Sequence, residues 1–314
     1  MAADDAKEKK HEMMEVPGFE LYERLGEGTM GVVFRARHQF TDQIVALKVL
    51  YPILAGNVTY LERFRAEAEA AVHLDHPNLV RVHGFGQRGL TYFICMEYVE
   101  GINLRDLLAR EGALDELTVI VIGMCVASAL HYAWEKSRLI HRDVKPENLL
   151  ISKDGRLKLC DMGIAKRMVP QPVDKSLTRT GYVVGTPHYI APEQLKGGKE
   201  LDCRVDIYAL GATLYNAATG HTIHQADNMF SLLMKQASEP ARDPREIMPG
   251  LDDAFCKLLL QMLDLDREKR PANWTVVYDE LAAIHERLTL ARMSAPIRIS
   301  SAERVETQTP GATA

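Results

Sequence analysis

The sequence lacks the cysteine and charge patterns of several protein classes. Its five cysteines include no C-x-x-C pair, so neither a zinc ribbon nor a redox-active pair is indicated, and we interpret them as buried thiols in a reducing compartment. The formal net charge is -5 and the isoelectric point is about 6.1, which argues against a nucleic-acid partner because such a partner needs a basic face. The remaining composition, 46% hydrophobic and 26% charged over 314 residues, fits a globular protein with one large domain or two lobes.

Targeting signals are missing as well. The N-terminal stretch has no apolar segment of the kind that a secretory signal needs, Ala2 excludes N-myristoylation, and the final GATA is not a prenylation motif. Residues 117–134 are apolar and about long enough to cross a bilayer, but they include Thr118, Ser128, His131 and Tyr132. A span there would also separate the motifs described below. We therefore predict a buried core helix, no membrane span and a cytoplasmic location.

The periodicity of apolar residues predicts a folded body at 19–290 between two disordered tails. Residues 1–18 are charged and reach a Pro-Gly turn, and residues 291–314 are rich in Ser, Thr, Ala and Pro. Short β-like runs occupy residues 19–99, and helices are predicted from residue 100 onward, at 103–110, 116–136, 204–218, 227–237, 252–263 and 273–288. This order predicts an α+β fold with two lobes.

One long helix interrupts the strands of the N-terminal lobe, at residues 59–74. Thr59 and Glu62 have the spacing of an N-terminal capping box, and Pro77 requires the helix to end before it. Two acidic residues of this helix, Glu67 and Glu69, lie about 200° apart on a helical wheel, so only one of them can face the strands.

A glycine-rich stretch, LGEGTMGVVF at residues 25–34, has the spacing G-x-G-x-x-G at Gly26, Gly28 and Gly31. A dinucleotide-binding fold would need a helix after these glycines and an acidic residue about 20 positions further on. Here the glycines run into a β-like stretch, and the residue that follows is Lys48, whose charge suits phosphates rather than a ribose. Because glycine has no Cβ, backbone N–H groups can approach phosphates closely. A phosphate-binding hairpin fits these residues, and so, at this point, does an ordinary flexible glycine hairpin.

Three further motifs follow in order: LIHRDVKPENLLI at 139–151, LCDMGIAK at 159–166 and GTPHYIAPE at 185–193. Together with the glycine motif, they make residues 19–290 resemble the protein kinases, and most closely the bacterial eukaryotic-like Ser/Thr kinases. The resemblance implies the two-lobed protein kinase fold, with an N-lobe at 19–99 and a C-lobe at 100–290. It also implies ATP and Mg²⁺ as cofactors, with Mn²⁺ as a substitute, and transfer of the γ-phosphate to Ser or Thr of protein substrates.

Catalytic and metal-binding roles follow from the same resemblance. Asp143 would orient the acceptor hydroxyl and accept its proton, and Lys145 would steady the γ-phosphate. Lys48 would bind the α- and β-phosphates. Asn148 and Asp161 would supply oxygen ligands to Mg²⁺, which is a hard cation.

Two more residues would support this machinery. Glu67 matches the family's helix motif, so it would aim Lys48, while the other acidic residue of that helix would face solvent. Thr186 matches a threonine that contacts the catalytic Asp143 and Lys145. The presence of Thr186 and Lys145 indicates Ser or Thr, rather than Tyr, as the acceptor.

An adenine pocket is implied as well. Met96 would be the gatekeeper, and backbone groups of Glu97 and Val99 would pair with the edge of the base. Cys160 would lie behind the phosphates. The remaining contacts would come from the glycine hairpin and from apolar residues on both faces of the ring: Leu25, Gly26, Glu27, Gly28, Gly31, Val33, Ala46 and Leu150.

Other matches to the family are structural. His141 would be a packing residue, although its type suggests a base or a ligand. Glu193 and Arg270 would form a buried ion pair that anchors the activation segment. Asp206 would brace the catalytic loop from below.

The chain also departs from the family pattern at three positions. Met162 stands where Phe is usual, and its flexible apolar side chain can fill a similar space. Tyr208 stands where Trp is common. Asn103 stands where kinases that select basic substrates often carry Glu, so the resemblance does not imply a preference for Arg upstream of the acceptor.

Regulation by phosphorylation is also predicted. Arg142 precedes the catalytic Asp143, and its guanidinium can bind a phosphate through two parallel hydrogen bonds. The activation segment carries Thr178 and Thr180 at positions where bacterial relatives autophosphorylate. The chain itself is therefore an expected substrate, and phosphorylation of both threonines is expected to raise its activity.

The main alternative is a pseudokinase, an interaction module with the same fold. Such a module would lack one of the residues Lys48, Asp143, Asn148 and Asp161, and all four are present. A small-molecule phosphotransferase of similar fold is disfavoured by GTPHYIAPE, which shapes a platform for protein substrates.

Overall fold

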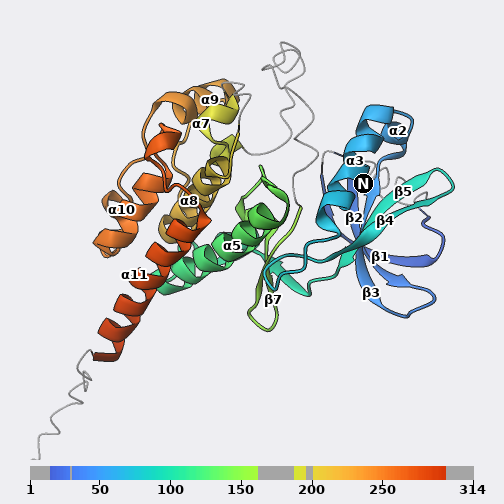
Figure 1. Cartoon of the computed structure of the whole chain (residues 1–314), viewed down its shortest axis with the longest axis horizontal. Coiled ribbons are helices and arrows are strands. Elements are labelled where there is room, and N and C mark those ends of the chain that lie inside the picture. The colour runs from blue at the N-terminus through green and yellow to red at the C-terminus, as the bar shows by residue number, and fades with distance from the viewer. Residues whose placement is uncertain (1–14, 29, 162–186, 196–200, 295–314) are drawn as a thin grey trace, which may run out of the picture.

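The computed structural model describes residues 15–28, 30–161, 187–195 and 201–294, apart from the side chains of Arg63 and Glu67. Its N-terminal lobe is an antiparallel sheet in the order β1-β2-β3-β5-β4, formed by β1 (Phe19–Glu27), β2 (Gly31–His38), β3 (Ile44–Leu50), β4 (Val82–Arg88) and β5 (Thr91–Glu97). These strands are rich in Val, Ile and Phe, which fit a pleated, half-buried surface. The short α2 (Pro52–Ala55) leads into α3 (Val58–Ala71), which covers one face of the sheet (Figure 1).

The start of α3 differs from the sequence prediction. Its N-cap is Asn57, whose Oδ1 accepts a hydrogen bond from the backbone N–H of Thr59 at 3.0 Å. The predicted capping box of Thr59 and Glu62 is therefore wrong, because Asn57 already satisfies a terminal N–H group and the helix begins at Val58.

The C-terminal lobe is mainly helical, as predicted. Its helices are α4 (Leu104–Glu111), α5 (Glu116–Ser137), α7 (Pro192–Leu195), α8 (Arg204–Thr219), α9 (Met229–Ser238), α10 (Asp253–Met262) and α11 (Trp274–Ser294). A small sheet, which the sequence analysis missed, contains β6 (Gly101–Asn103), β7 (Leu149–Ser152) and β8 (Leu157–Leu159). These strands of three or four residues are too short to produce a recognisable alternation.

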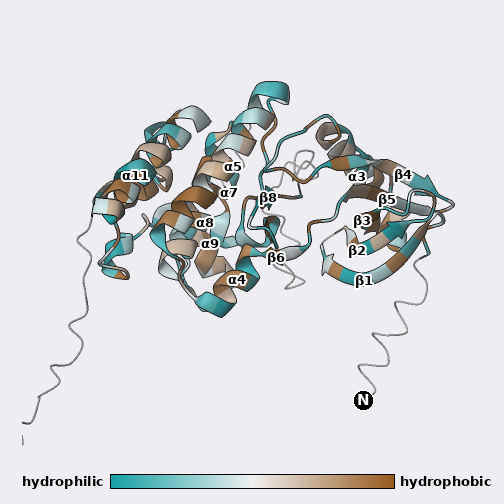
Figure 2. Cartoon of the chain, turned by 90° about the horizontal axis from the view of Figure 1, so that it is seen from below, coloured by the Kyte–Doolittle hydropathy of each residue, from teal (hydrophilic) through white to brown (hydrophobic). Residues whose placement is uncertain are grey.

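The core of this lobe forms around α8 and α5. Fourteen of the 16 residues of α8 are buried, and Figure 2 shows hydrophobic residues concentrated on it. A helix that is buried on all sides belongs in a protein interior. By length and composition α5 could cross a membrane, and half of its most apolar window is buried inside the protein, where it packs against α8, α11 and β8.

Both ends of the folded body extend beyond the predicted boundaries. Val16, which was assigned to the N-terminal tail, is 2% exposed and packs beside Phe19 against the sheet, and its carbonyl accepts from the Phe19 N–H at 3.0 Å. At the other end, α11 continues to Ser294, four residues into the predicted tail. The predicted disorder of residues 1–14 and 295–314 concerns parts of the chain outside the described residues.

Candidate active site

The glycine hairpin joins β1 to β2, and its three glycines differ in how much room the structure leaves for a side chain. A Cβ at Gly26 would meet no atom within 4 Å, and a Cβ at Gly28 would meet only the Gly31 carbonyl oxygen at 3.9 Å. A Cβ at Gly31 would lie 1.9 Å from the carbonyl oxygen of Val49 on β3, so only glycine fits there. The Gly28 N–H donates to the Gly31 carbonyl at 2.9 Å and closes the turn. The packing role of Gly31 against β3 was not predicted.

Residues predicted to line the adenine pocket come together from four separate segments. Ala46 and Met96 are directly opposite each other on β3 and β5 and belong to one apolar cluster. The partly buried side chains of Val33, Val99 and Leu150 pack against the same cluster. We call these five residues the apolar slot, since apolar side chains gathered in this way can desolvate both faces of a flat ring.

Lys48 lies two residues after Ala46 on β3, so both side chains point to the same face of the sheet. The Lys48 ammonium Nζ lies 3.0 Å from Oδ1 of Asp161, across 113 residues of sequence. Val33 pairs with Lys48 in the β2–β3 register. The predicted phosphate-binding cation and one predicted metal ligand therefore meet next to the apolar slot.

A short 3₁₀ turn, Pro146–Asn148, arranges the predicted catalytic residues. The Lys145 ammonium donates to Oδ2 of Asp143 at 2.9 Å, and Nδ2 of Asn148 lies 2.7 Å from the Asp143 carbonyl oxygen and 3.2 Å from its Oδ2. These contacts fix the orientation of the Asp143 carboxylate. Because Asn148 uses its Nδ2 on Asp143, its Oδ1 is the atom that can bind a cation.

His141 connects the two halves of the site through both ring nitrogens. Nδ1 accepts from the Asp143 backbone N–H at 3.2 Å, so Nε2 carries the proton and donates to the Cys160 carbonyl at 3.0 Å. The side chain is fully buried. Both nitrogens are occupied by backbone partners, which agrees with the structural role predicted for His141 and leaves it unsuited to act as a base.

Asp206 on α8 braces the same loop from the protein interior. Its Oδ2 and Oδ1 accept from the backbone N–H groups of His141 at 2.6 Å and Arg142 at 2.7 Å. Burial raises the pKa of this carboxyl to about 7, although the two N–H donors oppose that shift. The loop that it holds is strained, since Arg142 has φ of 64°, and Asp161, in the separate segment after β8, has φ of 54°. Such left-handed backbone persists only where surrounding contacts enforce it.

Comparison with known proteins agrees with this geometry. A family model described as the protein kinase domain matches residues 19–281. The chain belongs to the protein kinase family. It is 39% identical to the serine/threonine-protein kinase pkn3 of Myxococcus xanthus over 267 residues, and 33% identical to PknL of Mycobacterium tuberculosis over 280 residues. Those alignments cover 83% and 89% of this chain.

Relatives differ in how much of their length this kinase domain spans. The chain spans 48% of pkn3 and 69% of PknL, and 36% of a Clostridium perfringens protein named as a probable serine/threonine-protein kinase, to which it is 37% identical over 80% of its own length. Among solved structures, it is similar to the kinase domain of Mycobacterium tuberculosis PknI, with a TM-score of 0.66 and 28% identity. That match covers 86% of this chain and 97% of the PknI chain.

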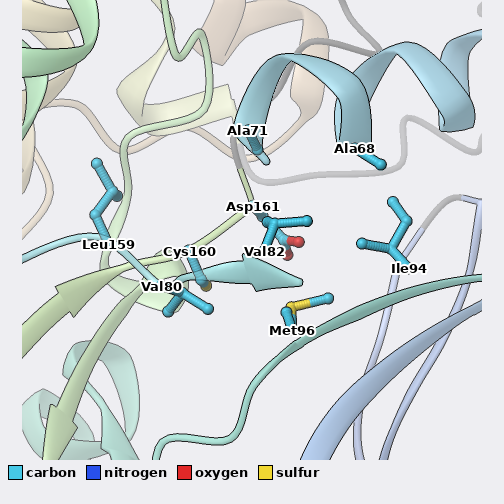
Figure 3. A pocket seen from close by; sticks show the side chains of 9 residues that line it. All are labelled: Ala68, Ala71, Val80, Val82, Ile94, Met96, Leu159, Cys160 and Asp161. Atoms are coloured by element: carbon cyan, nitrogen blue, oxygen red, sulfur yellow. The ribbon is translucent and has the colours of Figure 1, made fainter. Parts of the chain in front are cut away.

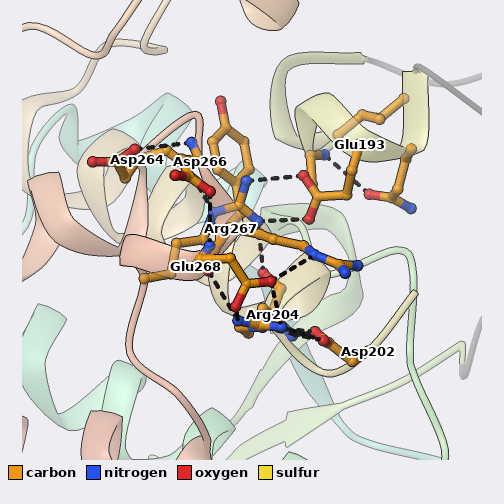
Figure 4. A network of polar contacts seen from close by, with 12 residues as sticks. Glu193, Asp202, Arg204, Asp264, Asp266, Arg267 and Glu268 are labelled. Atoms are coloured by element: carbon orange, nitrogen blue, oxygen red, sulfur yellow. Dashed lines mark hydrogen bonds and ion pairs between the residues drawn. The ribbon is translucent and has the colours of Figure 1, made fainter. Parts of the chain in front are cut away.

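The predicted ion pair of the kinase fold is present beneath the site. Arg270, whose side chain is completely buried, donates to both carboxylate oxygens of Glu193 at 2.7 and 2.9 Å. It also donates to the carbonyls of Asp264 and Arg204, and its guanidinium lies 4.9 Å from the ring centroid of Tyr208. Figure 4 shows how this network joins the Glu193 helix to α8 and to the turn before α11.

A small cavity of about 20 Å³ lies between α3 and the sheet, next to Met96 of the apolar slot (Figure 3). That space is about enough for one water molecule. Asp161 and Cys160 are among the residues that line it. Burial raises the pKa of the Cys160 thiol well above its usual value, so the thiol is neutral and weakly nucleophilic. The full lining is Ala68, Ala71, Val80, Val82, Ile94, Met96, Leu159, Cys160 and Asp161.

Two polar side chains near the slot have structural partners that the sequence did not indicate. Glu97 accepts from the Lys158 ammonium at 3.0 Å and from the Arg81 N–H at 3.2 Å, so its carboxylate connects the end of β5 to β8. Asn103 is the N-cap of α4, and its Oδ1 accepts from the Asp106 N–H at 2.8 Å. Asn103 is therefore already engaged at the position where other kinases often carry Glu.

Several predicted residues fall outside what the structure describes. Thr178, Thr180 and Thr186 belong to the undescribed stretch 162–186, as does Met162. Glu67 lies on α3, but its side chain is not described.

Two other predicted residues lie at the described hairpin. Leu25 is exposed there, and the carboxylate of Glu27 accepts from the Tyr51 hydroxyl and pairs with Arg24.

Proposed function

We propose that this chain transfers the γ-phosphate of ATP to Ser and Thr hydroxyls of proteins. The observation that carries the proposal is the arrangement around Asp143, whose carboxylate is oriented by Lys145 and Asn148. A carboxylate held in this way can orient an acceptor hydroxyl and take its proton as the bond to phosphorus forms. Lys48 and Lys145 contribute the positive charge that a polyphosphate requires.

A divalent cation fits the oxygen donors at the site. Asp161 offers a carboxylate and Asn148 offers Oδ1, while the described residues hold no group of three or more His, Cys, Asp or Glu side chains that could bind a metal alone. Mg²⁺ is commonly bound by one or two protein ligands together with phosphates and water, so we propose Mg²⁺, with Mn²⁺ as a substitute. When bound with ATP, the cation would neutralise phosphate charge.

The cellular location and the regulation are further parts of the proposal. We propose a cytoplasmic location and no membrane span within this chain, supported by the burial of α5 in the C-terminal lobe and by five free thiols. We also propose that the chain phosphorylates itself at Thr178 and Thr180. Arg142, next to Asp143, carries the guanidinium that would bind the resulting phosphate.

Mass spectrometry after incubation with ATP and MgCl₂ or MnCl₂ tests this function. We expect phosphate on an added acceptor protein and on Thr178 and Thr180, and none of it when EDTA is present. ATP binding without any phosphate transfer would support the pseudokinase alternative and contradict the proposal.

A further inference from the structure

Helix α9 places one polar side chain in the interior of the C-terminal lobe. Its two buried residues are Leu232 and Gln236, which lie about one turn apart on the same face. The Gln236 side chain has no exposed surface. Glutamine is rarely buried to this extent, and a buried amide normally has hydrogen-bond partners.

The amide of Gln236 has three acceptors around one nitrogen. Its Nε2 lies 3.0 Å from the His188 carbonyl oxygen, 3.2 Å from the Ile190 carbonyl oxygen and 3.0 Å from the Tyr208 hydroxyl oxygen. Carbonyl oxygens can only accept, so the two carbonyls determine which end of the amide faces them. Gln236 therefore links α9 to α8 and to the backbone on both sides of Tyr189.

The other end of this amide has no such partner. No described residue donates to Oε1 of Gln236, which is also buried. An unpartnered buried acceptor costs stability, and Leu or Met would fill a similar volume without that cost. The useful part of the side chain is therefore its pair of N–H donors.

Tyr208 makes the third contact possible. A tryptophan, which is common at this position in the family, has an indole N–H that donates but cannot accept from an amide. Burial raises the pKa of the Tyr208 hydroxyl, so it remains neutral and accepts from Nε2. Tyr at position 208, rather than Trp, therefore supplies an acceptor that the Gln236 amide uses.

The backbone that Gln236 holds borders the loop that carries the predicted catalytic residues. Tyr189 packs against the same apolar cluster as Ile140, the residue before His141, and Tyr208 belongs to that cluster. The Tyr189 hydroxyl also donates to Oδ1 of Asn216 on α8 at 3.1 Å. Residues 187–190 thus form a fixed edge beside the residues that would receive the acceptor hydroxyl.

We propose that Gln236 is a positioning residue for the acceptor polypeptide. It fixes the backbone of residues 188–190 at the edge of the site, and thereby sets the affinity for the protein substrate without touching it. The inference rests on the proposed kinase activity. It predicts a selective effect on the protein substrate, because ATP is bound by the hairpin, the slot and Lys48, which are remote from α9 in sequence and in fold.

Initial rates for Gln236→Met, with myelin basic protein and ATP varied separately, test this role. We expect the KM for the acceptor protein to rise at least tenfold, while the KM for ATP stays within twofold of the wild-type value. The matched control is Gln261→Met, the same change at an exposed residue of α10 whose amide makes one long contact of 3.4 Å with the Lys269 carbonyl. The control is expected to keep both constants.

A folded Gln236→Met variant with an unchanged acceptor KM, or with equal rises in both constants, would overturn the inference. If that variant does not fold, the KM for the acceptor protein and the KM for ATP are measured for Gln236→Asn instead. This variant retains the N–H donors on a side chain that is one methylene too short to reach both carbonyls. A wild-type protein that transfers no phosphate would contradict the proposed function itself. An active wild-type with an unaffected variant would contradict only the role of Gln236.

Discussion

Single side chains hold the catalytic loop mainly by binding its backbone. Asp206 accepts from two consecutive N–H groups, and His141 joins the Asp143 N–H to the Cys160 carbonyl. These contacts compensate for the left-handed backbone at Arg142, which is unfavourable for a residue with a Cβ. The position of Asp143 therefore depends on buried neighbours that never contact a substrate.

Asp206→Asn should destabilise the fold in a pH-dependent way. An amide can accept through only one atom, so one backbone N–H loses its partner, which costs about 1–3 kcal/mol. Because burial raises the pKa of Asp206 to about 7, above its unfolded value of about 4, the folded state holds a proton that the unfolded chain releases. The stability from this proton is fully present below about pH 4 and is lost as the pH rises through about 7.

Urea unfolding of both proteins between pH 5 and pH 8 measures this effect. The stability advantage of the wild type over the Asn variant should shrink as the pH rises towards 7, by up to about 1.4 kcal/mol per pH unit. An advantage that stays constant, or grows with pH, would mean that the two N–H donors keep Asp206 ionised throughout.

The β1–β2 hairpin illustrates how an element can be recognised in a sequence while the reasons for its residues are not. The spacing of the glycines and the strand that follows them indicate a phosphate-binding hairpin. The close approach of Gly31 to Val49 depends on how β2 pairs with β3, and a contact between separate strands has no signature in a one-dimensional spacing. The strands β6–β8 were missed for another reason, since three or four residues are too few to show an alternation.

Gly31→Ala should lower stability, because the new Cβ would lie 1.9 Å from the Val49 carbonyl oxygen and the two strands would have to separate. We expect a loss of about 1–3 kcal/mol in the free energy of unfolding. Gly26→Ala is the matched control, since its Cβ meets no atom within 4 Å, and it should change the KM for ATP rather than stability. Equal thermal midpoints for the two variants would contradict the packing role of Gly31.

At the scale of the whole molecule, the site forms where the two lobes meet. The Lys48–Asp161 ion pair joins β3 of the N-terminal lobe to the loop after β8, and the slot takes Val33 and Ala46 from one lobe and Leu150 from the other. The two-lobed fold and the residues of the catalytic turn could be predicted because their motifs are contiguous. Gln236 could not, since its three acceptors lie 28 to 48 residues away in the sequence and a lone helical glutamine carries no signal.

The most direct test of the account compares the wild-type chain with Asp143→Asn in a single-turnover transfer of phosphate from ATP to an acceptor protein. The variant keeps the apolar slot and Lys48, so we predict nearly unchanged ATP binding. Transfer should fall by about a hundredfold or more, because an amide cannot take the proton of the hydroxyl. A variant that retains more than about a tenth of the wild-type rate, a change in barrier of less than about 1.4 kcal/mol, would contradict the central role of Asp143.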